Sequence, residues 1–570
     1  MAIPLAACGS TQPRLDSSPG TDYLVFYAAG GQDKALEAIE TSGGRPLSTE
    51  PRLGYVVAHG VVASFLETLS NDKAIVGIST DRPIGFTSAA VQQQWAAAHP
   101  EWAGDHVDAR RPSLPEGPAA RTGTTSTAAA PDVAAGRKSA SRKTAGKNAL
   151  EPLAARQWDM KMIGADRANT IAPGDKKVLV GVIDTGIDGK HPDIAPNFNR
   201  ALSRNFVTDR PKDPNGQPFD GPCEVRTCQD PVDADDDGHG THVASTIGSP
   251  INGKGIAGVA PNVQLVNIRA GQDSGMFFLK PSLDALTYAA DNGIDVVNMS
   301  YYLDPWLFNC PNNKADSERE RLEQRGIITG MQRALDYARS KGVTLIAAIG
   351  NGSTDLGRPR KDEQSPDYPK NTERTRAIDN SCLNVPTESE GVIAISGLGP
   401  SGRKALYSDY GVEQTDLSAP GGDVLDGGGV STSRSILAAA PTAVMRATNK
   451  IDAAGRPKTT EVVRDCHGGQ CSYYQYLDGT SMAAPHATGV AAILISRFGR
   501  PGPGGTSMDP ASVERLLYSS ATPKACPVPR AYKYRYFGQE ETHVCEGDTA
   551  KNGFYGRGVI NAYKAATIAP

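Results

Sequence analysis

The sequence contains no long hydrophobic run and no excess of charge of either sign. No window of its 570 residues approaches 18 consecutive apolar residues, so we expect no transmembrane helix. The formal net charge is −4, with 59 Lys and Arg against 63 Asp and Glu. This balance gives no electrostatic reason to expect a nucleic-acid partner or attraction to an anionic membrane surface.

The sequence also lacks a cysteine pattern for zinc. It has nine cysteines, and eight of them, all except Cys8, lie beyond residue 220. Eight cysteines allow 105 pairings, and none of these eight forms the paired C-x-x-C arrangement of structural zinc sites, so disulfides are favoured over metal. Proximity in the sequence suggests the pairs Cys223–Cys228, Cys310–Cys382, Cys466–Cys471 and Cys526–Cys545. Disulfides indicate an oxidising compartment, so we expect a secreted protein.

Cys8 lies in a stretch of its own, Leu-Ala-Ala-Cys-Gly-Ser at residues 5–10. This stretch resembles a bacterial lipobox, in which the cysteine becomes the lipidated first residue of the mature protein. Only seven residues precede Cys8, with no charged n-region and no full apolar h-region. Either the true start lies upstream or the match arises by chance. The resemblance implies that lipidation at Cys8, on the outer face of a bacterial membrane, is the one membrane attachment to expect.

Composition divides the chain into four parts. Residues 1–21, which include the lipobox-like stretch, are rich in Ser, Thr, Pro and Gly beyond it and are expected to be disordered. The pattern of residues 22–82 predicts a small domain of strands and helices. Residues 83–150 are dominated by Ala, Thr, Ser, Pro and Arg, which indicates a linker and the easiest place for processing. Residues 151–570 form the main domain.

Within the small domain, the patterns predict three strands and two helices. The strands are expected at 23–27, 54–58 and 74–78, and the helices at 33–41 and 61–70. No obvious catalytic group lies in these elements, so an accessory or interaction domain is the simplest interpretation.

The main domain alternates apolar runs with helical patterns. Apolar runs lie at 178–183, 263–268, 294–299 and 343–348, and helical patterns lie at 281–292 and 327–341. This alternation predicts an α/β fold, a parallel sheet with helices on both faces. Functional sites of such sheets gather at the carboxyl ends of the strands. Asp184, Ser300 and Asn351 all follow predicted strand ends.

A serine lies at the start of a predicted apolar, Ala-rich helix. The stretch Asp-Gly-Thr-Ser-Met-Ala-Ala-Pro-His at 478–486 leads from a polar turn into an Ala-rich segment ending near Phe498. Ser481 is therefore expected in the first turn of a buried helix, whose free N–H groups favour negative charge nearby. Taken alone, the residue is more simply interpreted as a helix N-cap.

Two further segments carry an aspartate and a histidine. Val-Ile-Asp-Thr-Gly-Ile-Asp at 182–188 places Asp184 at a strand end, where an aspartate commonly caps a turn. Aspartic proteases need two Asp-Thr-Gly segments, and this chain has one. Gly-His-Gly-Thr-His-Val-Ala at 238–244 flanks His239 with glycines, which allow close approach to the ring.

A histidine pair and an aspartate-rich stretch are the two patterns that raise the question of a metal site. His239 and His242 lack a third ligand in reach, which makes a zinc site weak. Residues 233–238 copy the opening of an EF-hand loop, but its twelfth position is Ala244 where Glu is required. We therefore predict no EF-hand, although other calcium sites stay open.

Asn351 supplies an amide between two glycines after a buried strand, a place where asparagine also serves simply as a turn residue. Together, however, Asp184, His239 and Ser481 have the order of a catalytic triad, with an amide donor between the last two. A hydroxyl needs a base within reach, a group that orients the base, and donors for the developing oxyanion.

Residues from about 151 to 566 resemble the subtilases, the subtilisin-like serine peptidases of family S8, through the three motifs around Asp184, His239 and Ser481. The resemblance implies that Asp184 orients the imidazole, His239 acts as general base and then acid, and Ser481 is the nucleophile. It implies that Asn351 and the Ser481 backbone N–H form the oxyanion hole.

The same resemblance implies further features. Ser300, Ala348 and Gly350 would contact substrate, which would be a protein or peptide cleaved by a secreted serine endopeptidase. Residues 22–82 resemble the ferredoxin-like α+β propeptide of this family, so they imply a proenzyme with its own intramolecular inhibitor. No cofactor is implied for the chemistry. The family often binds structural calcium, but no motif in this chain fixes the ligands.

The chain departs from the family pattern beside the expected cleft. Tyr301 and Tyr302 stand where the family commonly has a small residue, and a long insertion starts at Asp304. Residues 423–475 are also longer than in a minimal member. These segments are either specificity loops or surface decoration held by disulfides. A catalytically idle binding module is the alternative function, and the intact triad argues against it.

Overall fold

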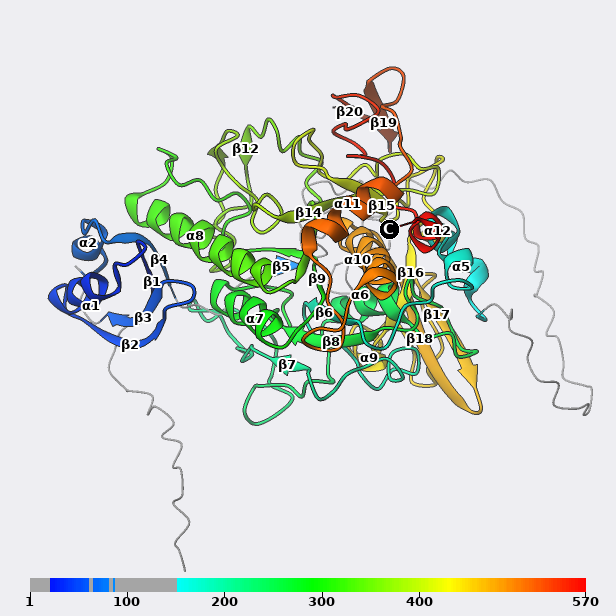
Figure 1. Cartoon of the computed structure of the whole chain (residues 1–570), viewed down its shortest axis with the longest axis horizontal. Helices are drawn as coiled ribbons and strands as arrows, with labels where there is room; N and C mark the ends of the chain where they lie inside the picture. The colour runs from blue at the N-terminus through cyan, green and yellow to red at the C-terminus, as the bar shows by residue number, and fades with distance from the viewer. Residues whose placement is uncertain (1–20, 61–64, 81–85, 88–150, 570) are drawn as a thin grey trace, which may run out of the picture.

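A computed structural model describes residues 21–60, 65–80, 86–87 and 151–569 (Figure 1). The lipobox-like stretch around Cys8 and most of the predicted linker lie outside the described residues. Within the described residues, no helix is both long enough and apolar enough to cross a bilayer.

The small domain is a four-stranded antiparallel sheet with two helices. Its elements in chain order are β1 (Thr21–Tyr27), α1 (Gln32–Thr41), β2 (Gly44–Glu50), β3 (Tyr55–Gly60), α2 (Phe65–Ser70) and β4 (Ile75–Thr80). The strand order β2-β3-β1-β4 with βαββαβ connectivity confirms the ferredoxin-like prediction. Strand β2 was missed because Gly-Arg-Pro-Leu-Ser-Thr-Glu has no apolar alternation; it lies at the sheet edge, with Leu47 exposed.

The main domain is built on a seven-stranded sheet in which every neighbouring pair is parallel. Its order is β15 (Leu417–Pro420), β14 (Val392–Leu398), β11 (Thr344–Ala348), β9 (Val296–Met299), β6 (Leu179–Ile183), β8 (Gln264–Arg269) and β7 (Arg204–Asn205). The four predicted strands are present, and β7, β14 and β15 were missed. Strand β14 is fully buried and apolar, so its signal was available in the sequence.

Helices cover both faces of this sheet, as predicted (Figure 1). Helices α6 (His239–Gly248) and α10 (Thr480–Phe498) share one hydrophobic core with the sheet. Helices α7 (Leu279–Asp291) and α8 (Glu318–Ser340) share the other. Helix α8 begins at Glu318 rather than at the predicted 327, because Ser317 and Glu320 form a capping box that starts the helix earlier.

Shorter elements surround the sheet. A second, antiparallel sheet consists of β16 (Ile436–Ala440), β17 (Val462–His467) and β18 (Gln470–Leu477). Small strand pairs are β5 (Phe86–Thr87) with β10 (Tyr301–Tyr302), β12 (Lys361–Asp362) with β13 (Arg376–Ala377), and β19 (Ala531–Tyr536) with β20 (Gln539–Val544). The remaining helices are η2 (Ala154–Arg156), α4 (Trp158–Met162), α5 (Ala165–Ala168), η3 (Thr432–Arg434), α9 (Thr442–Ala447), α11 (Pro510–Ser520) and α12 (Ala562–Thr567).

The four disulfides are the pairs suggested by sequence proximity. Cys310–Cys382 joins the insertion after β10 to the long loop after β11, beside the carboxyl edge of the sheet. The buried guanidinium of Arg376 reinforces this junction by donating to Asp316 at 2.8 Å and to Asp362 at 2.5 Å. The insertion is therefore an integral layer beside the sheet edge.

Candidate active site

The structure brings the predicted site residues together at one edge of the sheet. Asp184 follows β6, Ser300 follows β9, and Ala348 ends β11 just before Asn351. Because neighbouring strands run parallel, their carboxyl ends meet at this edge, where helix α10 also begins. Ser300 and Asn351 both make hydrogen bonds with the first turn of α10.

Asp184 and His239 form a buried hydrogen-bonded pair. The His239 Nδ1 atom lies 2.7 Å from Asp184 Oδ1, and the two side chains are 2% and 0% exposed. A carboxylate can only accept, so Nδ1 carries the proton and Nε2 is the basic nitrogen. The pair needs Gly240 beside it, because a Cβ there would lie 2.1 Å from the Gly186 carbonyl oxygen. Position 240, directly after His239, therefore has room only for a glycine.

The surroundings of His239 favour its protonated form. Burial opposes the charged ring, but the charge of Asp184 and the hydrogen bond to it raise the pKa of His239 above 6.5, assisted by the more distant Asp237 and Asp235. The ring is thus poised to accept a proton and to hold it during a reaction.

Ser481 is the second residue of α10 and makes a two-way contact with Ser300. The Ser481 hydroxyl donates to the Ser300 carbonyl at 3.3 Å, and the Ser300 hydroxyl donates to the Ser481 carbonyl at 3.1 Å. His239 Nε2 has no hydrogen-bond partner among the described residues. The bond from Ser481 to His239 that a triad requires is therefore not formed in this structure; such bonds commonly tighten only when substrate binds.

Asn351 is held in a fixed orientation by Thr480. The Asn351 Oδ1 atom accepts from both the backbone N–H and the hydroxyl of Thr480, each at 2.9 Å. Thr480 also accepts, through Oγ1, from the Gly350 N–H at 3.1 Å. The oxygen of the amide is therefore committed to Thr480, and Nδ2 is the donor end of the side chain. Thr480 was not singled out from the sequence, although it precedes Ser481 in the same motif.

Asp235 is a second supporting residue that sequence reasoning missed. Its carboxylate accepts from the Gly238 N–H at 2.8 Å, the Thr185 hydroxyl at 3.1 Å and the Thr241 N–H at 2.9 Å. It therefore ties the residue after Asp184 to the start of helix α6. In the sequence, the aspartate-rich stretch resembles only a fragment of a calcium loop, and no local pattern indicates this structural role.

The structure argues against the zinc alternative at His239 and His242. His242 Nε2 lies 3.1 Å from two backbone carbonyl oxygens, those of Ile436 and Gln475, so this nitrogen carries a proton. Burial lowers the pKa of His242 to about 3, which keeps the ring neutral. His242 thus anchors helix α6 to the second sheet.

Comparison with known families decides the classification. The model of the subtilase family, peptidase family S8, matches residues 175–558. This chain belongs to the subtilase family. The predicted resemblance is therefore confirmed over most of the main domain.

Individual relatives are distant. The thermophilic serine proteinase of Bacillus sp. strain AK1 is 27% identical over 333 residues, which cover 58% of this chain and 55% of that protein. Subtilisin DY of Bacillus licheniformis is 24% identical, over 64% of this chain and 91% of that protein. The solved epidermin leader peptide processing serine protease (EpiP) of Staphylococcus aureus is similar at a TM-score of 0.57 with 21% identity, covering 97% of this chain and 99% of that one. This last likeness shows the fold alone.

Proposed function

We propose that this subtilase is a serine endopeptidase that hydrolyses peptide bonds through an acyl-enzyme on Ser481. The observation that carries the proposal is the buried Asp184–His239 hydrogen bond, at the sheet edge where α10 presents Ser481. The family membership and the proteinase names of the relatives support it.

In the proposed reaction, His239 Nε2 takes the Ser481 proton as the hydroxyl oxygen attacks the substrate carbonyl carbon. The negative charge on the carbonyl oxygen is stabilised by the Asn351 amide and the Ser481 backbone N–H. The C–N bond then breaks as His239 donates its proton to the leaving amine, and water hydrolyses the remaining ester by the reverse sequence. Asp184 keeps Nδ1 protonated throughout, and Ser300, Ala348 and Gly350 line the substrate backbone.

We further propose that the chain is made as a proenzyme. Strand β5 pairs antiparallel with β10, Thr87 opposite Tyr301 and Phe86 opposite Tyr302. Strand β10 directly follows Ser300, whose carbonyl contacts the Ser481 hydroxyl. The chain that leads out of the small domain thus pairs with the backbone beside the nucleophile, as an extended substrate would, and self-cleavage is expected shortly after Thr87.

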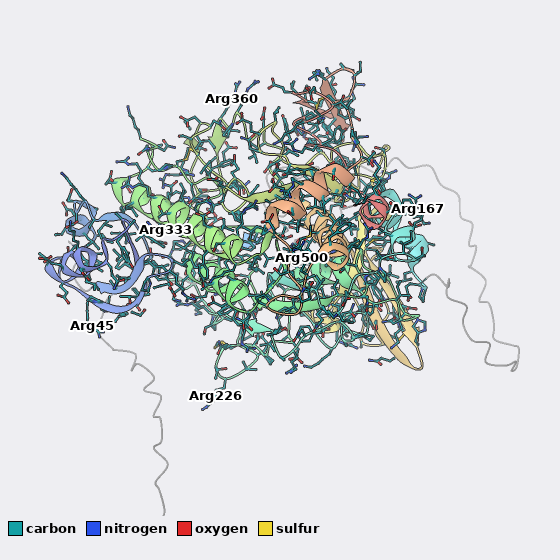
Figure 2. All side chains as sticks on the ribbon, viewed as in Figure 1. Arg45, Arg167, Arg226, Arg333, Arg360 and Arg500 are labelled. Atoms are coloured by element: carbon teal, nitrogen blue, oxygen red, sulfur yellow. A yellow bond between two sulfur atoms is a disulfide. The ribbon has the colours of Figure 1, made fainter. Side chains whose placement is uncertain are left out.

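The small domain also covers helix α8. Arg333 of α8, labelled in Figure 2, donates to the carbonyl oxygens of Tyr27, Leu53 and Gly54 at 2.9–3.1 Å. A Cβ at Gly77 would lie 2.5 Å from the Gly326 backbone, so the strand and the helix meet without side chains between them. This fitted surface supports the role of residues 22–82 as an intramolecular inhibitor.

Labelling with a fluorophosphonate tests the endopeptidase and the proenzyme together. Protein released from its small domain should form an adduct on the peptide that contains Ser481, because this reagent requires an activated serine. The small domain, added back in micromolar excess, should slow the labelling. Absence of an adduct would favour the idle binding module, whereas an adduct that forms at an unchanged rate would refute only the inhibitor role.

We propose a location outside the cytoplasm, where the protein acts on protein or peptide substrates. The four disulfides of the main domain support this location, because disulfides persist in oxidising compartments. Lipidation at Cys8 stays a prediction, since that residue lies outside the described part of the chain.

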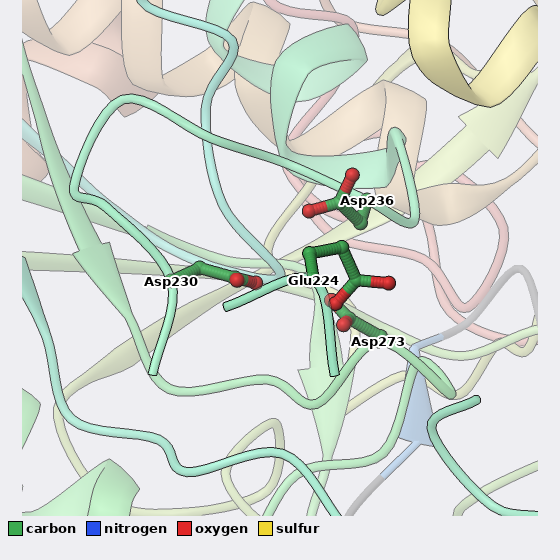
Figure 3. Close-up of side chains that lie close together, drawn as sticks. All are labelled: Glu224, Asp230, Asp236 and Asp273. Carbon is green, nitrogen blue, oxygen red and sulfur yellow. The ribbon is translucent and has the colours of Figure 1, made fainter. Parts of the chain in front are cut away.

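We propose a structural calcium site at a cluster of four carboxylates near helix α6. One oxygen each from Glu224, Asp230, Asp236 and Asp273 lies within 4.8 Å of the others, and Figure 3 shows the side chains converging. Calcium binds carboxylate oxygens at about 2.3–2.6 Å, which fits such spacing. The buried guanidinium of Arg269 is bonded to Asp230 and Asp273 at 2.5 and 2.9 Å.

The single positive charge of Arg269 does not neutralise the four carboxylates of the cluster. Asp273 Oδ2 is buried and has no hydrogen-bond partner among the described residues, while the side chain is 5% exposed. Burial, with repulsion from neighbouring carboxylates, raises the pKa of Asp273 to about 9 and that of Asp236 to about 6. A divalent cation would supply the missing positive charge and ligate the orphaned oxygen.

Calcium is accordingly expected to raise the midpoint of thermal unfolding of the mature protein. At 100 times its dissociation constant it would add about 2.7 kcal/mol to the free energy of unfolding. Thermal scans in calcium and in chelator measure the effect. Glu224→Gln should shift the half-saturating calcium concentration upward, whereas Glu363→Gln, at an exposed residue outside the cluster, should not. An identical response of both variants would exclude this site.

A further inference from the structure

The loop that carries Asn351 departs from regular backbone on both sides of this residue. Gly350 has φ +115° and Ser353 has φ +58°, both in the left-handed region. A glycine adopts this conformation without strain, but a serine does so at a cost and keeps it only where neighbouring structure holds it. The position of the Asn351 amide therefore depends on whatever fixes residues 350–354.

Residues 407–410 run alongside this loop and supply the backbone half of the support. Ser353 N–H donates to the Tyr407 carbonyl at 2.8 Å, Asp409 N–H donates to the Gly350 carbonyl at 3.0 Å, and Tyr410 N–H donates to the Thr354 carbonyl at 2.9 Å. These hydrogen bonds attach both ends of the loop 350–354 to residues 407–410, and Asn351 lies between the attached positions.

The Asp409 carboxylate fills the concave side of the loop. It is 3% exposed, and its Oδ1 accepts from the Thr354 N–H at 2.7 Å. A Cβ added at Gly350 would lie 2.2 Å from Oδ2, and one at Gly352 would lie 3.2 Å from Oδ1. The carboxylate thus lies against both residues that flank Asn351, closer to Gly350 than any residue with a side chain would allow.

A buried lysine lies near this buried carboxylate and favours its ionised form, although burial lowers the pKa of Lys404 itself to about 7. Lys404 is 1% exposed and donates to the carbonyl oxygens of Ser408 and Ala405 at 2.5 and 2.9 Å. Burial raises the pKa of Asp409 to about 7, opposed by the Thr354 N–H and by the charge of Lys404.

We propose that Asp409 is a positioning residue that sets the oxyanion donor, by holding residues 350–354 so that Asn351 presents its amide to the reacting carbonyl. Asp409 touches neither Ser481 nor His239 in the structure's hydrogen bonds, so it acts through Asn351. The proposal rests on the role of Asn351 proposed above.

The test is a double-mutant cycle on the mature enzyme, with Asp409→Asn, Asn351→Ala and the pair. The amide of Asp409→Asn has nearly the same size but must turn N–H donors toward Gly350 or Thr354. In the otherwise unchanged enzyme, Asp409→Asn should lower kcat about 10–30-fold. This loss is smaller than the 10²–10³-fold loss expected when an oxyanion donor is removed altogether, and KM should change less than threefold. In the Asn351→Ala background, the same substitution should change kcat less than threefold, because the donor it positions is absent.

Asp295→Asn is the matched control. Asp295 is 3% exposed, accepts from the Leu179 N–H at 2.8 Å, and has a pKa raised by burial to about 8, but it lies at the opposite end of the sheet. This control should leave kcat unchanged in both backgrounds.

Several outcomes would overturn the proposal. These are an equal loss of kcat in both backgrounds, a loss confined to KM, or no loss from Asp409→Asn while Asn351→Ala is impaired. If Asp409→Asn does not fold, Asp409→Ser offers a hydroxyl acceptor without a new amide; failure of both to fold would show that Asp409 supports the fold rather than one loop. A normal kcat for Asn351→Ala would instead refute the assigned oxyanion donor.

Discussion

Ser481→Ala is expected to remove nearly all peptidase activity, lowering kcat by about 10⁶. The substitution deletes the one oxygen that can form the acyl-enzyme, while the Asp184–His239 pair and Asn351 stay in place. Binding and oxyanion stabilisation should still leave about 10³–10⁴-fold acceleration over the reaction in water. Casein hydrolysis and single-turnover cleavage of a peptide amide measure the loss.

The same variant tests the proenzyme. If cleavage after Thr87 is carried out by the chain itself, the Ser481→Ala protein should accumulate with its small domain attached. Ser418→Ala is the matched control, because Ser418 is also fully buried but donates its hydroxyl to the Gly558 carbonyl, away from the site. A Ser481→Ala protein that matures and hydrolyses casein at the parental rate would eliminate the assigned nucleophile.

The three motifs could be recognised because each is local. Asp184, His239 and Ser481 lie in short segments in which neighbouring glycines and strand ends carry the signal, and the structure shows why: Gly240 leaves room for the Gly186 carbonyl. Helix α10 was predicted to its end at Phe498, because its Ala-rich and mostly apolar pattern extends that far.

The residues that hold the site in place could not be predicted in this way. Asp409 contacts a loop more than fifty positions earlier, at Thr354, and Asp235 joins segments separated by a comparable distance. The residues next to Asp409 and Asp235 in the sequence form no pattern that would distinguish a buried supporting aspartate from an aspartate on the surface. Likewise, the sequence shows Arg333 only as one charged residue on an amphipathic helix. Its contact with the small domain becomes visible only in the folded structure. Long-range hydrogen bonds of this kind emerge only from the packed chain.

Asn351→Ala is expected to lower kcat by about 10²–10³, equivalent to roughly 2.7–4 kcal/mol of transition-state stabilisation. The Asn351 oxygen is bonded twice to Thr480, so the amide is oriented before substrate arrives and loses little freedom in the reaction. Such a donor acts on charge that develops only as the carbonyl is attacked. KM should therefore change little while kcat falls.

Two measurements separate this role from a general loss of structure. A peptide aldehyde, which forms a tetrahedral adduct with Ser481, should bind Asn351→Ala far more weakly, whereas the small domain, which binds without such an adduct, should inhibit it almost as before. Thr480→Val removes one of the two bonds to the amide oxygen and should give a smaller loss of kcat in the same direction. If Asn351→Ala instead raised KM and left kcat intact, the amide would be a ground-state contact, and the oxyanion would have to depend on backbone donors alone.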